Sequence, residues 1–473
     1  MSASLSTALV IGGGIGGWAS AAALAPHCDR VLVIERDDLS PQPGRRRGVP
    51  QGDHFHVLAA GGRIALEELL PGTSDDLRAK GVPWTDPAQD TAFAWGSGWL
   101  PRGPSTMHTL QPSRHLLEWY LRERVSSLPN VEIVPGTRVM GLHLQRGRVA
   151  GVDAVVENTG EPVRFAAGLV VDSSGRASQS PSWLTRARFD APGETVVDAH
   201  WGFASTHVTV PDGWDPGCLA MVMAPTLTGD GPSSTRGAAM WLQEDHRLVI
   251  AALGAGRDHP PRDPDGFAGF LHSCGAGEMA HLYRRFTRGE PIATWRNAAS
   301  RRRDFASLER RPEGFVVLGD AVMAVNPLYG QGMATAAMGA RLLGETLAER
   351  AGTHLLGLAA DFQQRLNQLL LPAWQFATSS DFGVPGVEID GRPQAPSVWA
   401  GRTLALAAED PALSLKLIET LHLVRGMDWL NDDRLRTRVV ADWERLGSLS
   451  RPGPPLHSRP PATRDSHQNV VFP

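Results

Sequence analysis

Several residue types and patterns are scarce in this chain of 473 residues, and each scarcity argues against a class of protein. The three cysteines, Cys28, Cys218 and Cys274, lie far apart, without the spacing of a metal site or the even number of a disulfide framework. No uninterrupted apolar run approaches the ~18 residues that a membrane span requires. The net charge of −4 implies no nucleic-acid partner. Because the N-terminus also lacks the basic stretch of a signal peptide, we expect a cytoplasmic protein with free thiols.

The most informative feature that is present is a glycine-rich turn near the N-terminus. The apolar residues 7–11 (TALVI) lead into GGGIGG at residues 12–17, and the alanine-rich residues 18–25 are expected to form a helix. Gly12, Gly14 and Gly17 stand where a dinucleotide-binding turn needs a tight bend, close approach to a pyrophosphate and close helix packing. Glu35 ends the next apolar strand, where a carboxylate can accept hydrogen bonds from a ribose. The pattern predicts a dinucleotide site; the alternative is a tight turn without a ligand.

A second strand and turn lie far downstream. Residues 314–318 (GFVVL) lead into a Gly-Asp pair, and NPLYGQGM follows at residues 326–333. Together the two segments resemble the flavoprotein monooxygenases of the aromatic-hydroxylase and squalene-epoxidase class. In that class the Asp contacts the ribityl chain of FAD, and the turn opens a helix whose positive end faces the isoalloxazine. The residues that match this pattern are Gly319, Asp320, Pro327, Gly330, Gly332 and Met333.

Four further residues are candidates for cofactor contacts. Arg114 heads an expected helix at residues 113–125, and the resemblance implies that it reaches the FAD phosphates; the alternative is a solvated arginine. Of the basic residues 45–47, we expect Arg46 or Arg47 to offset pyrophosphate charge, unless this loop is merely solvated. Asp172, in DSSGR, stands where the resembled class has an Asp-Gly motif, which implies an FAD contact. Direct aromatic hydroxylases keep that Asp and Gly adjacent, whereas two serines separate them here.

Residues 48–56 (GVPQGDHFH) contain a His-x-His pair. On a strand, His54 and His56 would share one face as half of a metal site, but no further ligand is apparent and we expect no metal. Together with NPLYGQGM, this segment resembles bacterial flavin epoxidases that act on polyether polyketide precursors, the monensin and lasalocid types. The Trp-x-Trp-x-Ile-Pro run of flavin halogenases and the Tyr-x-Trp-x-Phe-Pro run of geranylgeranyl reductases are absent.

The predicted fold class is α/β, with a Rossmann-type FAD-binding domain interleaved with an antiparallel-sheet substrate domain, plus C-terminal helices. We expect the first part of the FAD-binding domain at residues 1–184 and its second part at 301–354. Stretches of alternating apolar and polar residues, separated by Pro/Gly/Asp turns, predict the substrate sheet at 185–300. A helical region at 355–450 and a mobile tail at 451–473 complete the chain.

The resemblance implies FAD-dependent monooxygenation, in which a flavin C4a-hydroperoxide transfers one oxygen atom from O2 to a large apolar substrate. We expect alkene epoxidation in secondary metabolism, such as antibiotic biosynthesis, on a polyketide or isoprenoid. Apolar strands such as CLAMVMAP at residues 218–225 favour an apolar substrate over a phenol; the alternative is that they form only domain core. NAD(P)H would supply electrons, directly or through a separate flavin reductase. We nominate no catalytic acid or base. Aromatic hydroxylation, or a reductase or dehydrogenase on the same scaffold, are the other candidates.

Overall fold

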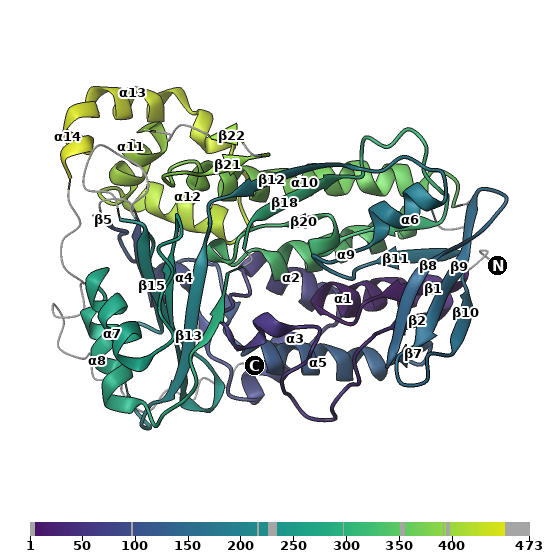
Figure 1. The fold of residues 1–473 in the computed structure, drawn as a ribbon. Coiled ribbons are helices and arrows are strands. Elements are labelled where there is room, and N and C mark those ends of the chain that lie inside the picture. Colours follow the sequence, from purple (N-terminus) through teal and green to yellow (C-terminus); the bar gives the residue numbers. More distant parts are fainter. Residues whose placement is uncertain are drawn as a thin grey trace, which may run out of the picture.

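The computed structural model describes residues 5–95, 98–214, 217–225, 234–296, 298–350, 355–390, 392–393 and 398–449. The tail predicted at 451–473 lies outside these ranges. A parallel sheet occupies one end of the molecule and a larger, mainly antiparallel sheet the other, with helices along and beyond both (Figure 1). This arrangement confirms the predicted α/β fold class. The domain boundaries themselves stay a prediction.

The parallel sheet has five strands, in the order β19-β11-β1-β2-β7. Its strands are β1 (Leu5–Ile11), β2 (Cys28–Ile34), β7 (Val131–Val134), β11 (Leu169–Asp172) and β19 (Phe315–Val317). Ile11 pairs with Asp172, and Asp172 pairs with Val317. Because these strands are parallel, the loops that follow β1, β11 and β19 leave the same edge of the sheet. The glycine turn, the Asp172 loop and the Gly319-Asp320 pair are thereby brought together.

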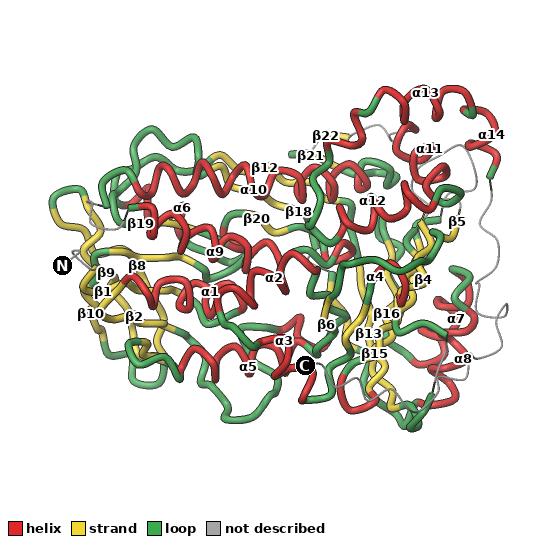
Figure 2. The backbone as a smooth tube through the Cα atoms, turned by 180° about the vertical axis from the view of Figure 1, so that it is seen from behind, coloured by secondary structure: helices red, strands yellow, loops and turns green. Residues whose placement is uncertain are grey.

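Four helices lie in succession beside this sheet, each in contact with the next, as both views show (Figures 1 and 2). They are α10 (Leu358–Asp381), α9 (Gly332–Glu349), α1 (Ile15–Leu24) and α5 (Arg114–Ser126). The Ser113 hydroxyl accepts a 3.2 Å hydrogen bond from the Leu116 amide and so caps the start of α5. Helices α1 and α9 begin at the two predicted glycine turns.

The larger sheet has seven strands, in the order β17-β13-β16-β15-β14-β4-β5. Its strands are β4 (Thr91–Trp95), β5 (Gly98–Trp99), β13 (Gly202–Thr209), β14 (Ala220–Met223), β15 (Arg236–Leu242), β16 (Arg247–Gly254) and β17 (Ala293–Trp295). The pairings are antiparallel except between β14 and β4, which run parallel. Strands β4 and β5 come from residues that the sequence placed with the FAD-binding part of the chain. Strand β4 joins them to this sheet by pairing with β14, more than a hundred residues away, and local pattern does not encode such a pairing.

The two faces of this sheet have different neighbours. Met221 and Met240 belong to a core cluster shared with α7 (Pro264–Ser273) and α8 (Gly277–Phe286). Val222 and Trp241, on the opposite face, cluster with Phe55 and Val57, which belong to the segment after β2. One face of the sheet thus packs against α7 and α8 as domain core, whereas the opposite face meets the segment after β2.

Smaller elements complete the described part of the chain. A three-stranded sheet contains β8 (Thr137–Gln145), β9 (Arg148–Val156) and β10 (Pro162–Ala166), and β3 (Trp84–Thr85) pairs with β6 (Thr109–Leu110). A second five-stranded sheet contains β12 (Gly193–Asp198), β18 (Ser300–Asp304), β20 (Met323–Ala324), β21 (Glu388–Ile389) and β22 (Arg392–Pro393). The other helices are α2 (Ala60–Leu69), α3 (Thr73–Ala79), α4 (Pro87–Asp90), α6 (Ser180–Arg186), α11 (Val398–Ala407), α12 (Pro411–Leu421), α13 (Asp433–Ala441) and α14 (Trp443–Ser448). Among the described residues, no helix is both long and apolar enough to cross a lipid bilayer.

Candidate cofactor site

The glycine turn between β1 and α1 contains two kinds of glycine. The fold requires Gly12 and Gly17, whereas Gly14 leaves open space beside the start of α1. Gly12 has φ +96°, and a Cβ added there would lie 2.8 Å from the Ser173 carbonyl oxygen. A Cβ on Gly17 would lie 1.8 Å from the Gly12 oxygen. Gly14, the N-cap of α1, has an ordinary φ of −93°, and no atom lies within 4 Å of where its Cβ would be. The fold alone therefore does not explain a glycine at position 14, whereas a ligand lying over the start of α1 would.

Glu35 lies beside this turn, directly after β2. Its carboxylate is buried and accepts hydrogen bonds from the Gly13 amide at 2.6 Å and the Asp37 amide at 2.8 Å. Glu35 thus holds the glycine turn against the end of β2. Its predicted role as a ribose acceptor stays a prediction.

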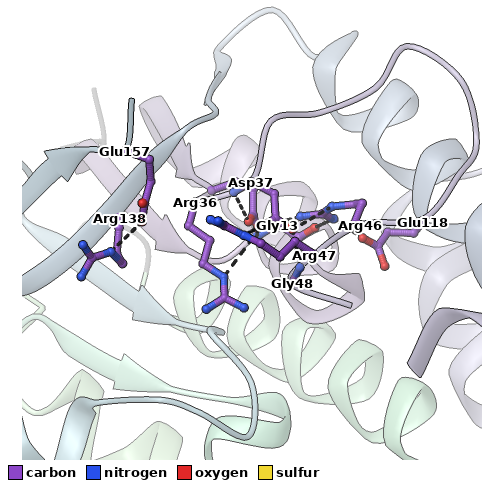
Figure 3. A network of polar contacts seen from close by, with 10 residues as sticks. Gly13, Arg36, Asp37, Arg46, Arg47, Gly48, Glu118, Arg138 and Glu157 are labelled. Carbon is purple, nitrogen blue, oxygen red and sulfur yellow. Dashed lines mark hydrogen bonds and ion pairs between the residues drawn. The ribbon is translucent and has the colours of Figure 1, made fainter. Parts of the chain in front are cut away.

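Arg46 lies at the centre of a cluster of carboxylates (Figure 3). Its guanidinium lies 3.0 Å from a Glu35 oxygen and 3.6 Å from an Asp37 oxygen, contacts Glu118, and donates to the Gly13 carbonyl at 2.7 Å. Burial alone would lower the pKa of Arg46, but the carboxylates of Glu118 and Glu35 raise it. The arginine is therefore held in its charged form next to the glycine turn.

The other two predicted arginines differ in environment. The Arg47 side chain is 74% exposed, and its Nε lies 3.8 Å from Asp37. Arg114, the first residue of α5, is largely buried and pairs with Glu118 at 3.0 Å. Arg46 and Arg114 share Glu118, so three carboxylates face two buried guanidiniums at this end of the site. Contacts of any of these arginines with phosphate stay a prediction.

Asp172 is fully buried at the end of β11, and its own loop satisfies it. One carboxylate oxygen accepts from the Ser174 amide at 2.9 Å and the Ser174 hydroxyl at 2.6 Å. The other accepts from the Ser178 hydroxyl at 2.5 Å and from the Ser180 hydroxyl. Ser174, one of the two serines that interrupt the Asp-Gly pattern, is thus a donor that shapes this turn, together with Ser178 and Ser180. A direct FAD contact by Asp172 stays a prediction, and the hydrogen bonds assign the carboxylate a structural task of its own.

Asp320 differs from Asp172, since its carboxylate makes no hydrogen bond or ion pair with any residue that the structure describes. It is partly buried, after Gly319 with φ +64°, and its Oδ1 lies 3.6 Å from where a Cβ on Gly332 would be. Burial raises the pKa of Asp320, although the charges of Arg176, Arg114 and Arg301 oppose that rise. A carboxylate that is partly withdrawn from water and lacks protein donors fits a ligand that brings hydroxyl donors.

The turn before α9 is anchored by two residues that sequence reasoning missed. The side-chain amide nitrogen of Asn326 donates to both oxygens of Asp381 at 2.8 Å, and the Trp201 indole donates to the same carboxylate at 2.9 Å. Burial raises the pKa of Asp381 to about 7, against the effect of these donors. Asp381 ends α10 and Trp201 precedes β13, so no local signal in the sequence links them to Asn326.

The remaining predicted residues follow Asn326. Pro327 opens a short 3-10 helix, and Gly330 has φ +62°, where a Cβ would lie 2.8 Å from Val57. Gly332 begins α9, and Met333 is buried in its first turn. The His-x-His segment is not a strand: His54 Nδ1 lies 3.1 Å from the Ser205 hydroxyl, and His56 Nδ1 bonds the His54 carbonyl. Within the described ranges, no three His, Cys, Asp or Glu residues are placed to hold a metal ion.

An aromatic cluster connects this turn to the seven-stranded sheet. Tyr329 lies 6.2 Å, centroid to centroid, from Trp95 on β4 and 5.7 Å from Phe376 on α10. Trp95 lies 5.4 Å from Phe376 and 5.5 Å from Phe93. The side of the turn toward the large sheet is therefore apolar.

Taken together, the residues fit FAD at both of its ends. Open space over Gly14 and the N-terminus of α1 suit a pyrophosphate, and the uncommitted Asp320 suits ribityl hydroxyls. The N-terminus of α9 begins beside Asp320 and would present positive potential to the isoalloxazine end. Which residues contact FAD stays a proposal.

No protein-family model matches the chain. Protein Rv3254 of Mycobacterium tuberculosis is 30% identical to it over 475 residues, which cover 92% of this chain and 96% of that protein. Squalene epoxidase 5 of Arabidopsis thaliana is 27% identical over 329 residues, which cover 69% of this chain and 58% of the epoxidase.

Solved structures share the fold at lower identity. A triple mutant of the flavin-dependent brominase Bmp2 has a TM-score of 0.64 and 14% identity, over 93% of this chain and 99% of that chain. The probable FAD-dependent monooxygenase PqsL of Pseudomonas aeruginosa has a TM-score of 0.58 and 17% identity, over 80% and 96%. At these identities the structures support the fold alone, and the sequence relatives carry the assignment. The partial match to squalene epoxidases and the shared fold support an enzyme of the FAD-dependent monooxygenase class, and the chain belongs to the family of Protein Rv3254.

Proposed function

We propose that this monooxygenase epoxidises an alkene in a large apolar molecule, such as a polyketide or isoprenoid of secondary metabolism. The observation that carries the proposal is the buried aromatic cluster at the turn before α9, where Tyr329, Trp95 and Phe376 contact one another. The partial match to squalene epoxidases, whose named substrate is an apolar polyene, supports it. The match of residues 48–56 and 326–333 to polyether epoxidases adds a narrower expectation of the same kind.

When bound and reduced, FAD would react with O2 and supply the oxygen atom; the protein binds, orients and excludes water. Gly14 and the start of α1 would hold the pyrophosphate, and Glu35 the adenosine ribose. Asp320 would accept hydrogen bonds from the ribityl hydroxyls. We assign no catalytic acid or base, since transfer of oxygen to an alkene requires no proton to be removed from the substrate. Phenol hydroxylation would favour a base beside the ring hydroxyl.

The proposed substrate wall is the inner face of the seven-stranded sheet, by which we mean the face that meets Phe55 and Val57. Val222 and Trp241 lie on this face, and burying hydrocarbon against it would contribute roughly 25 cal/mol per Å². Met221 and Met240, which also suggested an apolar wall from sequence, point to the core with α7 and α8 and are excluded from it. The proposed wall is thus narrower than the strand sequences implied.

A pair of isosteric substitutions tests this wall. Val222→Thr places a hydroxyl on the inner face, and Val208→Thr places the same hydroxyl in the opposite core cluster. An unpaired buried hydroxyl costs about 1–3 kcal/mol, so we expect the KM for a polyene to rise about 5- to 100-fold in Val222→Thr. Val208→Thr should lower stability but leave KM unchanged. Equal KM values in both variants would remove this face from the substrate site.

Product mass separates the candidate reactions. Purified holoenzyme, supplied with NAD(P)H and a flavin reductase so that the electron source is not limiting, is incubated with a panel of polyenes and phenols. Epoxidation adds one oxygen atom to a polyene, whereas reduction or dehydrogenation changes the product by two hydrogens. Oxygen addition to phenols alone would replace epoxidation by aromatic hydroxylation.

A further inference from the structure

A charged cavity of about 330 Å³ lies where the chain passes from the second five-stranded sheet to the seven-stranded sheet. Its walls come from the connection between β12 and β13, the loop after β16 and the approach to β18. The polar residues that line it are Asp198, His200, Arg257, His259 and Arg296. Ala298 and Ala299 complete the lining. None of these residues belongs to the predicted FAD contacts.

Two residues of this cavity have a backbone conformation that side chains disfavour. His200 has φ +50° and Arg257 has φ +70°, and the Arg257 amide donates to the His200 carbonyl at 3.2 Å. The same carbonyl lies 3.0 Å from His259 Nε2. Left-handed non-glycine residues cost free energy and concentrate at functional sites, and here the two lie against each other at one cavity.

The carboxylates near the cavity lie close to a histidine, whereas its two arginines have no partner among the described residues. Asp198 accepts from the His200 amide at 2.8 Å and lies 3.3 Å from His200 Nδ1, while Glu388 lies 3.7 Å from His200 Nε2. Both carboxylates are thus directed to one imidazole. The exposed guanidiniums of Arg257 and Arg296 make no ion pair or hydrogen bond with any residue in the described ranges. Two positive groups therefore face the cavity without a partner among the residues that the structure describes.

The cavity adjoins the FAD site through its wall. The Ala299 carbonyl accepts a hydrogen bond from Arg176, which follows the Asp172 loop and whose charge opposes the rise that burial causes in the pKa of Asp320. The hydroxyl of the next residue, Ser300, accepts a 3.0 Å hydrogen bond from the backbone amide of Asn326. A ligand in the cavity would therefore lie close to the end of the site assigned to the isoalloxazine.

We propose that this cavity binds phosphate oxygens, and that its ligand is the diphosphate of the nicotinamide dinucleotide that reduces the enzyme directly. Two guanidiniums suit a diphosphate because each can donate two parallel hydrogen bonds to its oxygens. The same chemistry would also hold a substrate carried as a phosphate-bearing thioester. The proposal rests on the proposed flavin chemistry for its ligand, but the oxyanion site can be tested without turnover.

The first arm of the test measures inorganic pyrophosphate binding to the holoenzyme by titration calorimetry. We expect Arg257→Met and Arg296→Met each to raise the Kd about tenfold or more, since a hydrogen bond to a charged group is lost. Arg434→Met, an exposed arginine on α13, is the matched control and should leave the Kd unchanged. Absence of pyrophosphate binding by the natural protein, or equal binding by all variants, would overturn the oxyanion site.

The second arm identifies the source of the phosphate. NADPH and NADH are titrated anaerobically, without substrate or O2, while the loss of flavin absorbance is followed. In both cavity variants the half-saturating concentration should rise about tenfold, whereas bleaching by dithionite and the oxidised flavin spectrum should not change. Loss of pyrophosphate binding with unchanged bleaching would overturn the assignment to the reductant. Because no alkene is present, failure of the epoxidase proposal leaves these results standing.

Discussion

Gly14→Val should abolish FAD retention while leaving the fold intact. Gly14 has a φ that any residue adopts, and its Cβ would meet no atom within 4 Å, so the valine side chain would enter only the space assigned to pyrophosphate. Displacing the phosphate would lose one or two backbone hydrogen bonds to a charged group, at about 1.5–3 kcal/mol each. The expected rise in the FAD Kd is about tenfold to ten-thousandfold. Replacing an N-cap glycine should cost about 1 kcal/mol of unfolding free energy.

Two variants control this experiment. Gly14→Ala carries the same loss of cap with only a Cβ, so it should weaken FAD binding less at equal stability. Gly17→Val should fail to fold, because its Cβ would lie 1.8 Å from the Gly12 oxygen. FAD affinity is measured by flavin fluorescence, and apoprotein stability by denaturant unfolding. Full FAD occupancy in soluble Gly14→Val would refute the reasoning and leave the loop a turn without a ligand.

Three other predictions concern the cofactor site. The purified protein should be yellow and release FAD, rather than FMN or NAD, on denaturation and chromatography. Asp320→Ala should raise the FAD Kd about ten- to a hundredfold, and more than Arg114→Ala, because Asp320 has no partner among the described residues whereas Arg114 is already paired with Glu118. The reverse order of Kd values, measured by flavin fluorescence, would show that the isoalloxazine end of the site is wrongly assigned. Burial raises the pKa of Asp381 to about 7 from 3.8, so the folded protein holds a proton that the unfolded chain releases, and the contribution of this group to stability should fall as pH rises from about 4 to 7. Asp381→Asn should flatten that part of the Tm–pH profile, and an unchanged slope would contradict the assignment.

The glycine turns and the strands before them could be predicted from sequence because each is local. Gly12 is favoured by its φ of +96°, Gly17 is required by its contact with Gly12 in the same turn, and Ser113 caps the helix that it directly precedes. The parallel register that aligns Ile11 with Asp172 and Val317 follows from the fold class once that class is inferred. These features position most of the candidate site.

What could not be predicted depends on contacts between distant segments. Asp381 meets Asn326 across 55 residues, and its burial is a property of the assembled fold. Likewise, the spacing of Arg46 in a basic loop does not reveal that Glu35 and Glu118 would surround it. Alternating strands such as the one containing Val222 could be recognised, but which face meets α7 and α8 could not.

The central claim is that the enzyme places one oxygen atom from O2 on an alkene. The most direct test is turnover of a polyene by reduced holoenzyme under 18O2, with mass spectrometry of the product, beside a parallel reaction in H2 18O under ordinary O2. The account predicts one 18O atom in the epoxide from 18O2 and none from water. A product changed only by two hydrogens would contradict monooxygenation, and a polyene recovered without the label would contradict epoxidation.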